Sequence, residues 1–395
     1  MTASGGTFLG YARPDGTVGI RNHVVVIAAM DNVNPVVRRI CAQVAGTVPV
    51  CVAYGRGQFG ADLEQHDRVL AGYGSHPNVA AALVVGLEPK TTQRMAVRIA
   101  GSGRPVCWLD VQGSGGTVRA VEKGVRMALD LVLTATEAQR REFPLADLVL
   151  GVECGASDAT SGLTANVVTG HVSDWLVEEG GTVVLSETDE IVGAEHLLGQ
   201  RADSAEVQRS LLAAVARLEA LSRFQGIQLW PLGEDNIAGG LSTPEEKSLG
   251  AIRKGGTSAL REVVGYGVRP SRKGLVFMDA PAPGVENITA LAAGGAHLII
   301  FNTGVGNPVG HALSPTIKVT GNPQTAELFA DNLDLDVSAV LTDGLDLAEA
   351  AVALRGLMIK VANGRATKSE VLGDTEISIS RLELGFLHQC GAGPS

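Results

Sequence analysis

The stretch LADLVLGVECGASDATSGLTANVVTG, residues 145–170, decides the fold. Its first part, LADLVLGVE (145–153), predicts a buried strand, because a short apolar run bounded by turn residues is typical of a parallel sheet. Glu153 and Cys154 should stand at the carboxyl end of that strand, and the next helix should begin within a few residues of Leu163. A strand that ends in a polar turn and leads to a helix is the repeating unit of α/β proteins.

Similar units extend along the whole chain. The first part predicts strands at 24–30, 48–54, 79–87 and 106–112 and a long helix at 117–135. The second part predicts strands at 145–153, 182–188, 275–280, 297–303 and 317–321 and helices at 164–179, 205–223, 244–264 and 345–362. This alternation predicts two α/β domains with parallel sheets covered by helices on both faces. A polar segment that ends at Pro144 marks the expected boundary, which gives domains at 1–143 and 144–395.

Composition narrows the classes of function. Asp and Glu number 42 against 32 Lys and Arg, so the net charge of −10 argues against a broad nucleic-acid-binding face. A small anionic ligand stays compatible with that charge, since a few local cations are enough to bind a carboxylate. The five cysteines include no C-x-x-C pair, which argues against a zinc knuckle or a disulfide scaffold. The sequence shows neither a signal peptide nor a membrane span, so we expect a cytoplasmic protein.

Polar side chains follow several of the predicted strands. They are Glu153, Glu187, Asp279 and Asn302 with their neighbours. Because ligands bind beyond the carboxyl ends of parallel strands, these residues predict one site at one edge of a sheet. The alternative is that each polar residue caps the helix that follows it.

The turn after residue 154 predicts an anion site. Ser157, Ser161 and the free N–H groups of the next helix are expected to hold an anionic ligand. Glu153 and Asp158 are the candidate catalytic carboxylates of this turn, and they are expected to share one cleft with Glu187.

The densest acidic run is SETDEIVGAEH (186–196). Glu187, Glu190 and Glu195 are candidate metal ligands, because carboxylate oxygens suit Mg²⁺, Mn²⁺ or Fe²⁺. Glu187 and His196 are also candidates for proton transfer at a carbon acid. The alternative is an acidic first turn that the helix dipole favours.

The run GGLSTPEEKSLGAIRKGGT (239–257) combines a helix start with basic residues between glycines. Lys247, Arg253 and Lys254 are candidates for holding a substrate carboxylate. A solvated amphipathic helix is the alternative explanation for these charges.

Several stretches together resemble the altronate/galactarate dehydratase family, whose large catalytic region also serves as the larger subunit of sulfolactate sulfo-lyase. The matching stretches keep their order along nearly the whole chain. They are GYARPDGTVGIRNHVVVI (10–27), DLEQHDRVLAGYGSHPNVAAALVVGL (62–87), ECGASDATSGLTAN (153–166), LSETDEIVGAEHLL (185–198), GGLSTPEEKSLG (239–250), KGLVFMDAP (273–281) and GRATKSEVLG (364–373).

This resemblance implies a lyase that removes water or sulfite from the position β to a carboxylate in a small hydroxy or sugar acid. It implies a divalent or iron cofactor, a Rossmann-like C-terminal sheet and an N-terminal α/β domain that makes a homodimer contact. Asn166 and Lys368 become candidate substrate-binding residues by motif match, beside Asn302 from the strand ends. The match also covers the residues already singled out: Glu153, Asp158, Glu187, Glu190, Glu195, His196 and Lys247.

Two differences from the family pattern matter. Fused family proteins begin with a small β-rich SAF-type domain, whereas this chain starts at the GYARPDG stretch. We therefore expect either a separate SAF-domain subunit as a partner or an enzyme that works without that domain. The family has cysteines where this chain has Asn32, Arg56, Pro89 or a neighbour, and Ala251, and only Cys154 keeps its motif. We therefore expect no iron–sulfur cluster. Ile237 also replaces a family lysine.

Two other functions stay open at this point. A diverged, non-iron enzyme of the same fold would explain the replaced cysteines. A non-catalytic ligand-binding partner would keep the fold and a pocket, although the intact acidic and basic runs favour an enzyme.

Overall fold

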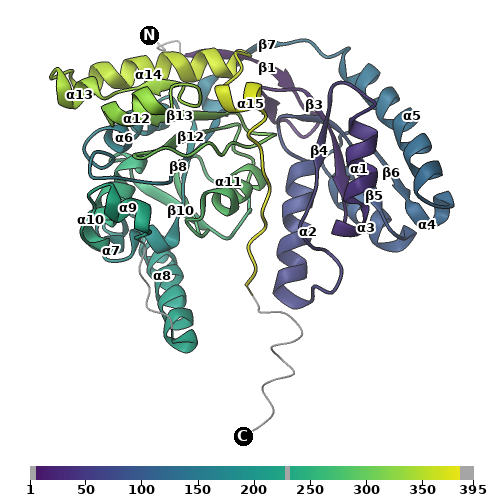
Figure 1. Cartoon of the computed structure of the whole chain (residues 1–395), viewed down its shortest axis with the longest axis horizontal. Coiled ribbons are helices and arrows are strands. Elements are labelled where there is room, and N and C mark those ends of the chain that lie inside the picture. The colour runs from purple at the N-terminus through teal and green to yellow at the C-terminus, as the bar shows by residue number, and fades with distance from the viewer. Residues whose placement is uncertain (1–5, 227–231, 383–395) are drawn as a thin grey trace, which may run out of the picture. The chain divides into compact units, whose positions relative to one another are not determined.

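The computed structural model describes residues 6–226 and 232–382, which form two compact units (Figure 1). The larger unit consists of the N-terminal segment up to Leu9 with Glu142–Ala292 and Ala296–Glu376. The smaller unit contains, among the described residues, Gly10–Arg141, Ala293–Gly295 and residues 377–382. Both units contain a parallel sheet with helices, which confirms the predicted α/β class. The domain boundary between residues 143 and 144 stays a prediction.

The larger unit is built on a seven-stranded sheet in the order β10-β11-β9-β8-β12-β13-β14. Its strands are β8 (Val149–Cys154), β9 (Thr182–Leu185), β10 (Leu260–Val264), β11 (Gly274–Met278), β12 (Leu298–Asn302), β13 (Thr316–Thr320) and β14 (Leu335–Asp336). Every neighbouring pair is parallel. The predicted strands of the second part of the chain therefore belong to one sheet, and all their carboxyl ends meet at one edge.

Helices lie on this sheet, and α6 packs against α14 and η4. The α-helices of the unit are α6 (Ala165–Glu178), α7 (Glu195–Gly199), α8 (Ala205–Gln225), α9 (Glu234–Ala238), α10 (Pro244–Ala251), α11 (Gly284–Ala293), α12 (Pro323–Leu328), α13 (Ala339–Thr342), α14 (Leu347–Ala362) and α15 (Lys368–Leu372). Single 3₁₀ turns are η2 (Leu145–Asp147), η3 (Thr188–Ile191) and η4 (Ile252–Gly255). No helix among residues 6–226 and 232–382 is both long and apolar enough to cross a membrane.

Local sequence sets where α10 begins, but the helix predicted over 244–264 is wrong in its second half. Thr243 caps the helix with its side chain, and Pro244 occupies the first helical position, as the sequence predicts. The helix ends at Ala251, η4 follows, and Gly256 takes a φ of +61°, which a side chain would oppose. LREVV then forms edge strand β10, whose apolar residues pack on the sheet instead of continuing a helix.

The smaller unit contains a four-stranded parallel sheet in the order β4-β3-β5-β6. These strands are β3 (His23–Ala28), β4 (Thr47–Val50), β5 (Val79–Gly86) and β6 (Val106–Asp110). The helices of the unit are η1 (Asp31–Val33), α1 (Asn34–Cys41), α2 (Gly60–Gly74), α3 (Pro89–Ala100), α4 (Val111–Ser114) and α5 (Thr117–Ala135). A further sheet has the order β2-β1-β7, with β1 (Thr7–Ala12), β2 (Val18–Gly19) and β7 (Arg141–Pro144).

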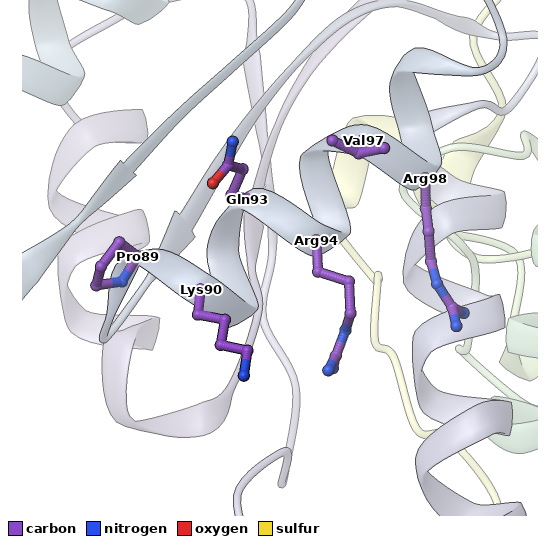
Figure 2. A pocket seen from close by; sticks show the side chains of 6 residues that line it. All are labelled: Pro89, Lys90, Gln93, Arg94, Val97 and Arg98. Atoms are coloured by element: carbon purple, nitrogen blue, oxygen red, sulfur yellow. The ribbon is translucent and has the colours of Figure 1, made fainter.

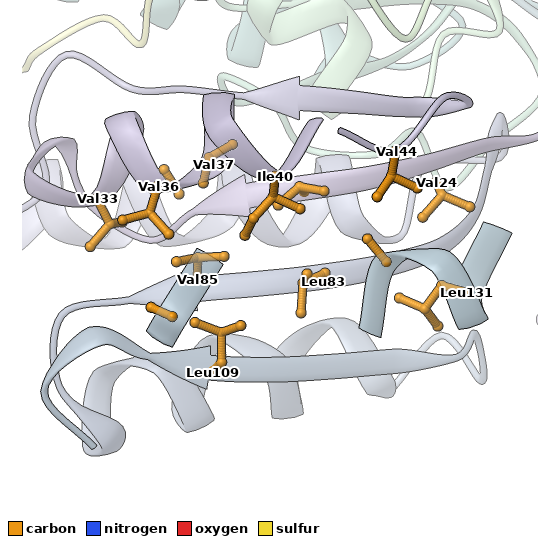
Figure 3. Close-up of a cluster of buried hydrophobic side chains, with 14 of the residues drawn as sticks. Val24, Val33, Val36, Val37, Ile40, Val44, Leu83, Val85, Leu109 and Leu131 are labelled. Carbon is orange, nitrogen blue, oxygen red and sulfur yellow. The ribbon is translucent and has the colours of Figure 1, made fainter. Parts of the chain in front are cut away.

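The core of the smaller unit lies between its sheet and helices α1 and α5, as Figure 3 shows. Val24 and Val26 of β3 point into it with Leu83 and Val85 of β5, because alternate strand residues share a face. Ile40 of α1 packs on these residues. Burial of this branched aliphatic surface, worth roughly 25 cal/mol per Å² of apolar area, favours the predicted arrangement of strands and helices.

Candidate functional site

The carboxyl end of β8 lies at the topological switch point of the larger sheet. The chain passes from β8 to β9 on one side and later returns to β12 on the other side. The strand connections leave β8 in opposite directions, which is where α/β sheets usually bind ligands. Glu153 and Cys154 occupy this end, opposite Phe301 and Asn302 of β12.

The turn that follows β8 is shaped by close packing. A methyl group on Gly155 would approach the Phe301 ring to 2.7 Å, and one on Gly162 would lie 3.1 Å from the Gly250 Cα. Ala156 has a φ of +55°, which is uncommon for a residue with a side chain. The turn then enters α6 at Ala165, in agreement with the predicted helix start.

Asp158 holds this turn together. Its Oδ1 accepts hydrogen bonds from the backbone N–H and the hydroxyl of both Thr160 and Ser161, at 2.7–3.0 Å. Its Oδ2 accepts a bond from Asn322 Nδ2 at 2.7 Å. Because both oxygens are occupied, these contacts favour a positioning role for Asp158, and they also bind Ser161 into the turn.

A buried cluster of three acidic or thiol groups and two lysines lies beside the end of β8. The Cys154 N–H donates to Glu187 Oε1 at 3.0 Å, and the Cys154 thiol donates to Glu190 Oε2 at 3.3 Å. Lys254 Nζ donates to Cys154 Sγ at 2.7 Å and forms an ion pair with Glu187. Lys247 Nζ forms an ion pair with Glu190 at 2.8 Å. We call these five residues the Cys154 cluster.

Backbone geometry at Glu187 brings its side chain into the cluster. Glu187 follows β9 directly and has a φ of +72° and a ψ of +65°, in the left-handed region. A non-glycine residue held there stores about 1–3 kcal/mol of strain and is typical of functional sites. The turn aims the carboxylate at the Cys154 N–H and Lys254, so the contacts of the cluster offset the strain.

The lysines carry positive charge inside the protein. Burial opposes the charged form, but Cys154 and Glu187 around Lys254, and Glu190 beside Lys247, raise both lysine pKa values above their usual range. Burial raises the pKa of Glu187 to about 7, against the attraction of Lys254. Burial also raises the pKa of the Cys154 thiol. The acidic side chains around them therefore favour the ammonium form of both lysines.

Glu153 points to the other face of β8 from Cys154, since successive strand side chains alternate. Its side chain is fully buried, and both carboxylate oxygens lack a hydrogen-bond partner among the described residues. Burial, followed by the Glu187 charge, raises the pKa of Glu153 well above its ordinary value. A methyl group on Gly284, the first residue of α11, would lie 3.5 Å from Glu153 Oε1. Such an unpaired buried carboxyl is uncommon in proteins and makes Glu153 a candidate for contact with a ligand.

Amide and hydroxyl side chains continue along the end of the sheet. Asn302 Nδ2 donates to Asn166 Oδ1 at 2.9 Å, and Asn166 Nδ2 donates to the Gly250 carbonyl at 3.1 Å. Thr169 donates to Asn302 Oδ1 at 3.0 Å. The buried hydroxyl of Ser157 has no partner in the described part of the chain. Ser157 therefore joins Glu153 as a buried polar group available to a ligand.

Four of the predicted site residues lie apart from the Cys154 cluster. His196, Arg253 and Lys368 have exposed side chains, and no contact within residues 6–226 and 232–382 joins these side chains to it. Glu195 accepts the Gly193 N–H at 2.5 Å, so its carboxylate is engaged within its own turn. Their catalytic, substrate-binding and metal roles stay predictions without a supporting contact.

Sequence reasoning missed Lys318 of β13, which is fully buried. Glu153, Phe301 and Lys318 stand in register on β8, β12 and β13. Lys318 Nζ lies 5.6 Å from the Phe301 ring centroid and donates to the Val309 carbonyl. The signal was a lysine inside the apolar strand IKVTG, where an unpaired cation is costly.

Lys318 should lower stability at neutral pH. Burial lowers the pKa of Lys318 to about 8, despite the attraction of Asp334, so the folded state disfavours its charged form. The free energy of unfolding is therefore highest above the unfolded pKa of lysine near 10.4, where Lys318 is neutral in both states. It falls as the pH drops toward 8, because the unfolded state then binds a proton that the folded state disfavours. Lys318→Met should therefore raise the free energy of unfolding by about 1–2 kcal/mol at pH 7, but not at pH 10.5.

Denaturant unfolding at both pH values measures this difference, and the exposed Lys360→Met is the matched control. A Lys318→Met protein that is less stable than the original chain at pH 7 would contradict the assignment of a buried, poorly compensated charge.

The donor set fits a divalent metal ion. One ligand atom from each of Cys154, Glu187 and Glu190 lies within 4.8 Å of the others. Metal–ligand distances of about 2.0–2.3 Å place two donors on one ion at most roughly 4.6 Å apart, so the three side chains would need only a small inward shift to bind one ion. Lys254 already holds a cationic group against two of these donors, so an ion would have to displace its ammonium.

Comparison with known proteins identifies the family of the chain. The family described as D-galactarate/Altronate dehydratase, C-terminal, matches residues 145–384, and D-galactarate dehydratase/Altronate hydrolase, second domain, matches residues 10–136. The chain belongs to the D-galactarate/altronate dehydratase family. The resemblance noted in the sequence is thereby confirmed, and the C-terminal match covers the whole Cys154 cluster.

Three relatives in this family are similar to the chain over different shares of their length. The chain is 38% identical over 388 residues to the (2R)-sulfolactate sulfo-lyase subunit beta of Chromohalobacter salexigens, covering 97% of this chain and 99% of that protein. It is 31% identical over 385 residues to the altronate dehydratase of Bacillus subtilis, covering 94% and 77%. It is 35% identical over 230 residues to the galactarate dehydratase (L-threo-forming) of Escherichia coli, covering 58% and 44%.

Proposed function

We propose that this member of the D-galactarate/altronate dehydratase family is a lyase that catalyses β-elimination from a small hydroxy or sugar acid. The observation that carries the proposal is the buried Glu153, whose oxygens have no hydrogen-bond partner in the described part of the chain, near a cluster with two buried lysines. Elimination needs a base for the proton α to a carboxylate and positive charge for the enediolate that forms. Its relatives are named as dehydratases and a sulfo-lyase, which supports the same class of reaction.

In the proposed reaction Glu153 acts as the base. It removes the α-proton, the electrons of that C–H bond form the C=C bond, and the bond from the β-carbon to the leaving group breaks. Hydroxide leaves as water after taking a proton, or sulfite leaves as the anion. The enol product then becomes the 2-keto acid by taking up a proton at carbon and losing the proton of its hydroxyl group.

Lys247 and Lys254 are proposed to stabilise the negative charge that develops on the substrate carboxylate. Both are buried, so their charges act in a medium of low polarity where they are worth more than in water. Each is held by a carboxylate before substrate arrives, so little reorganisation is needed during the reaction. Ser157 supplies a further hydroxyl for the substrate.

A divalent ion (Mg²⁺, Mn²⁺ or Fe²⁺) is proposed as a cofactor. Cys154, Glu187 and Glu190 would hold it, and the sulfur favours Fe²⁺ over Mg²⁺. When bound, the ion would replace the Lys254 ammonium at these donors and would supply a Lewis acid that polarises a substrate oxygen.

Assembly with other chains is also proposed. The sulfo-lyase relative is named as a beta subunit, which supports a complex with a separate small subunit such as the expected SAF-type chain. A homodimer and a cytoplasmic location stay predictions from the sequence.

A substrate panel tests the proposed function. Purified protein, stripped of metal and then supplied with Mg²⁺, Mn²⁺ or Fe²⁺ without oxygen, is incubated with altronate, galactarate and (2R)-sulfolactate. We expect a 2-keto acid from one of these acids, with sulfite as a second product of sulfolactate. The assay is repeated in the presence of the candidate small subunit.

Binding of one acid without turnover under every condition would favour the alternative of a non-catalytic ligand-binding subunit. Turnover of none of the three acids, but of another acid in a wider screen, would favour a diverged reaction on the same fold.

A further inference from the structure

A second candidate site lies in the smaller unit. A cavity of about 330 Å³ is found where strands β3, β4, β5 and β6 end. Met30 lines it after β3, the 55–58 loop after β4, Leu87 after β5 and Gln112 after β6. The chain leaves β3 toward β4 on one side and continues to β5 on the other, so the cavity occupies the switch point of this sheet. None of its lining residues belongs to the Cys154 cluster.

Two arginines give the cavity a positive lining. Arg56 has an exposed side chain without a hydrogen bond or ion pair to the other described residues. Arg94 of α3 forms a 3.1 Å ion pair with Asp67, and Figure 2 shows it on the same side of α3 as Lys90 and Arg98. Arginine is the side chain best suited to a carboxylate, because its fork makes two parallel hydrogen bonds.

The single carboxylate that lines the cavity is already engaged. Glu88 caps α3 by accepting the N–H groups of Lys90 at 2.7 Å and Thr91 at 2.8 Å. The Glu88 carboxylate is thus bound to the N-terminus of α3 and does not pair with Arg56, so the Arg56 guanidinium is available to a ligand.

Gln58 is the second, independent sign of a ligand. Its side chain lines the cavity, the residue is 6% exposed, and its Oε1 has no hydrogen-bond partner in the described chain. Buried amide groups are nearly always bonded. Half a turn of the terminal amide presents either its oxygen or its N–H groups, so Gln58 can accept from a hydroxyl or donate to an oxygen.

Backbone packing fixes the loop that carries Arg56 and Gln58. A methyl group on Gly55 would lie 2.7 Å from the Met30 Cα, so only glycine allows the loop to pack on the segment after β3. Gly57, with a φ of +80°, has open space on the side where a Cβ would be. The loop is thereby held against the sheet, with open space at Gly57.

We propose that this cavity binds a small hydroxylated carboxylate. Arg56 and Arg94 hold the carboxylate, and Gln58 bonds a hydroxyl group next to it. The site is distinct from the proposed catalytic site, and it needs no metal.

Calorimetric titration of the full chain with tartrate and with succinate tests the proposal. The two four-carbon dicarboxylates differ in the hydroxyl groups that Gln58 would bond. We expect tartrate to bind more tightly than succinate, and Arg56→Gln to weaken tartrate binding at least tenfold. Gln58→Met should remove the preference for tartrate.

Arg98→Gln is the matched control, because Arg98 lies on the same side of α3 but does not line the cavity. It should leave tartrate affinity unchanged. An unchanged tartrate isotherm in Arg56→Gln would overturn the proposal, because the binding would then belong to another site. An equal loss of tartrate affinity in Arg98→Gln, or tighter binding of inorganic phosphate than of tartrate, would show that the surface binds anions by net positive charge alone. Either result would also overturn the proposal.

Discussion

Lys254→Met is expected to lower the free energy of unfolding by about 3–5 kcal/mol and to reduce turnover at least 100-fold. The substitution leaves the Glu187 carboxylate buried without its cation, and breaking a buried ion pair from one side costs this much. Turnover falls because a preorganised cation at the substrate is typically worth a factor of 10²–10³. Denaturant unfolding and the substrate assay measure the two effects.

A double variant separates the two effects. Lys254→Met combined with Glu187→Gln removes both charges, so it should recover at least half of the lost stability and none of the activity. The neighbouring Arg253→Met is the control, and its exposed side chain should change stability by less than about 0.5 kcal/mol. A fully active Lys254→Met protein would exclude this lysine from the proposed reaction.

Glu153→Gln is expected to reduce kcat by about 10²–10⁴-fold with little change in KM or stability. The amide has the shape of the carboxyl but is unable to accept the α-proton, and general-base catalysis contributes a factor of this size. Stability should change by less than about 1 kcal/mol, because neither carboxylate oxygen makes a hydrogen bond to the described chain that the substitution would break.

Glu245→Gln is the control for this variant, since Glu245 lies exposed on α10. Wild-type kcat in Glu153→Gln would assign the base to another group. A large loss of stability would instead show that Glu153 bonds a partner within the protein.

The position of the site was predictable from sequence because it depends on local patterns. Short apolar runs that end in polar residues placed Glu153, Glu187 and Asn302 at strand ends. Parallel strands point the same way, so these ends had to meet once the strands joined one sheet. The structure shows this sheet.

The assignment of exposed and buried charges was not predictable in the same way. Lys247 and Lys254 are seven residues apart, two helical turns, and both are buried, whereas Arg253 between them is exposed. The spacing was a usable signal, but the helix ends at Ala251 and β10 begins at Leu260, which a run of charged and apolar residues does not reveal. Tertiary packing decides such short segments.

Long-range pairings were also beyond the sequence. Strand β11 lies between β9 and β10, although β10 comes first in the chain. Residues 377–382 belong to the smaller unit, where Tyr54 donates to the Ile379 carbonyl at 3.0 Å and the Leu382 N–H donates to Asp62 at 2.6 Å. No local pattern specifies partners more than 300 residues away.

The central place of β8 has a consequence for synthesis on the ribosome. One edge of β8 pairs with β9 soon after translation, but the other edge waits for β12, whose first residue, Leu298, follows Cys154 by 298 − 154 = 144 residues. At about 5–20 residues per second, this interval is on the order of ten seconds. During that time the apolar VLGVEC strand has an open edge and its cysteine is accessible to oxidants. Nascent chains should therefore be most vulnerable to aggregation and thiol oxidation at the strand that carries the proposed catalytic residue Glu153.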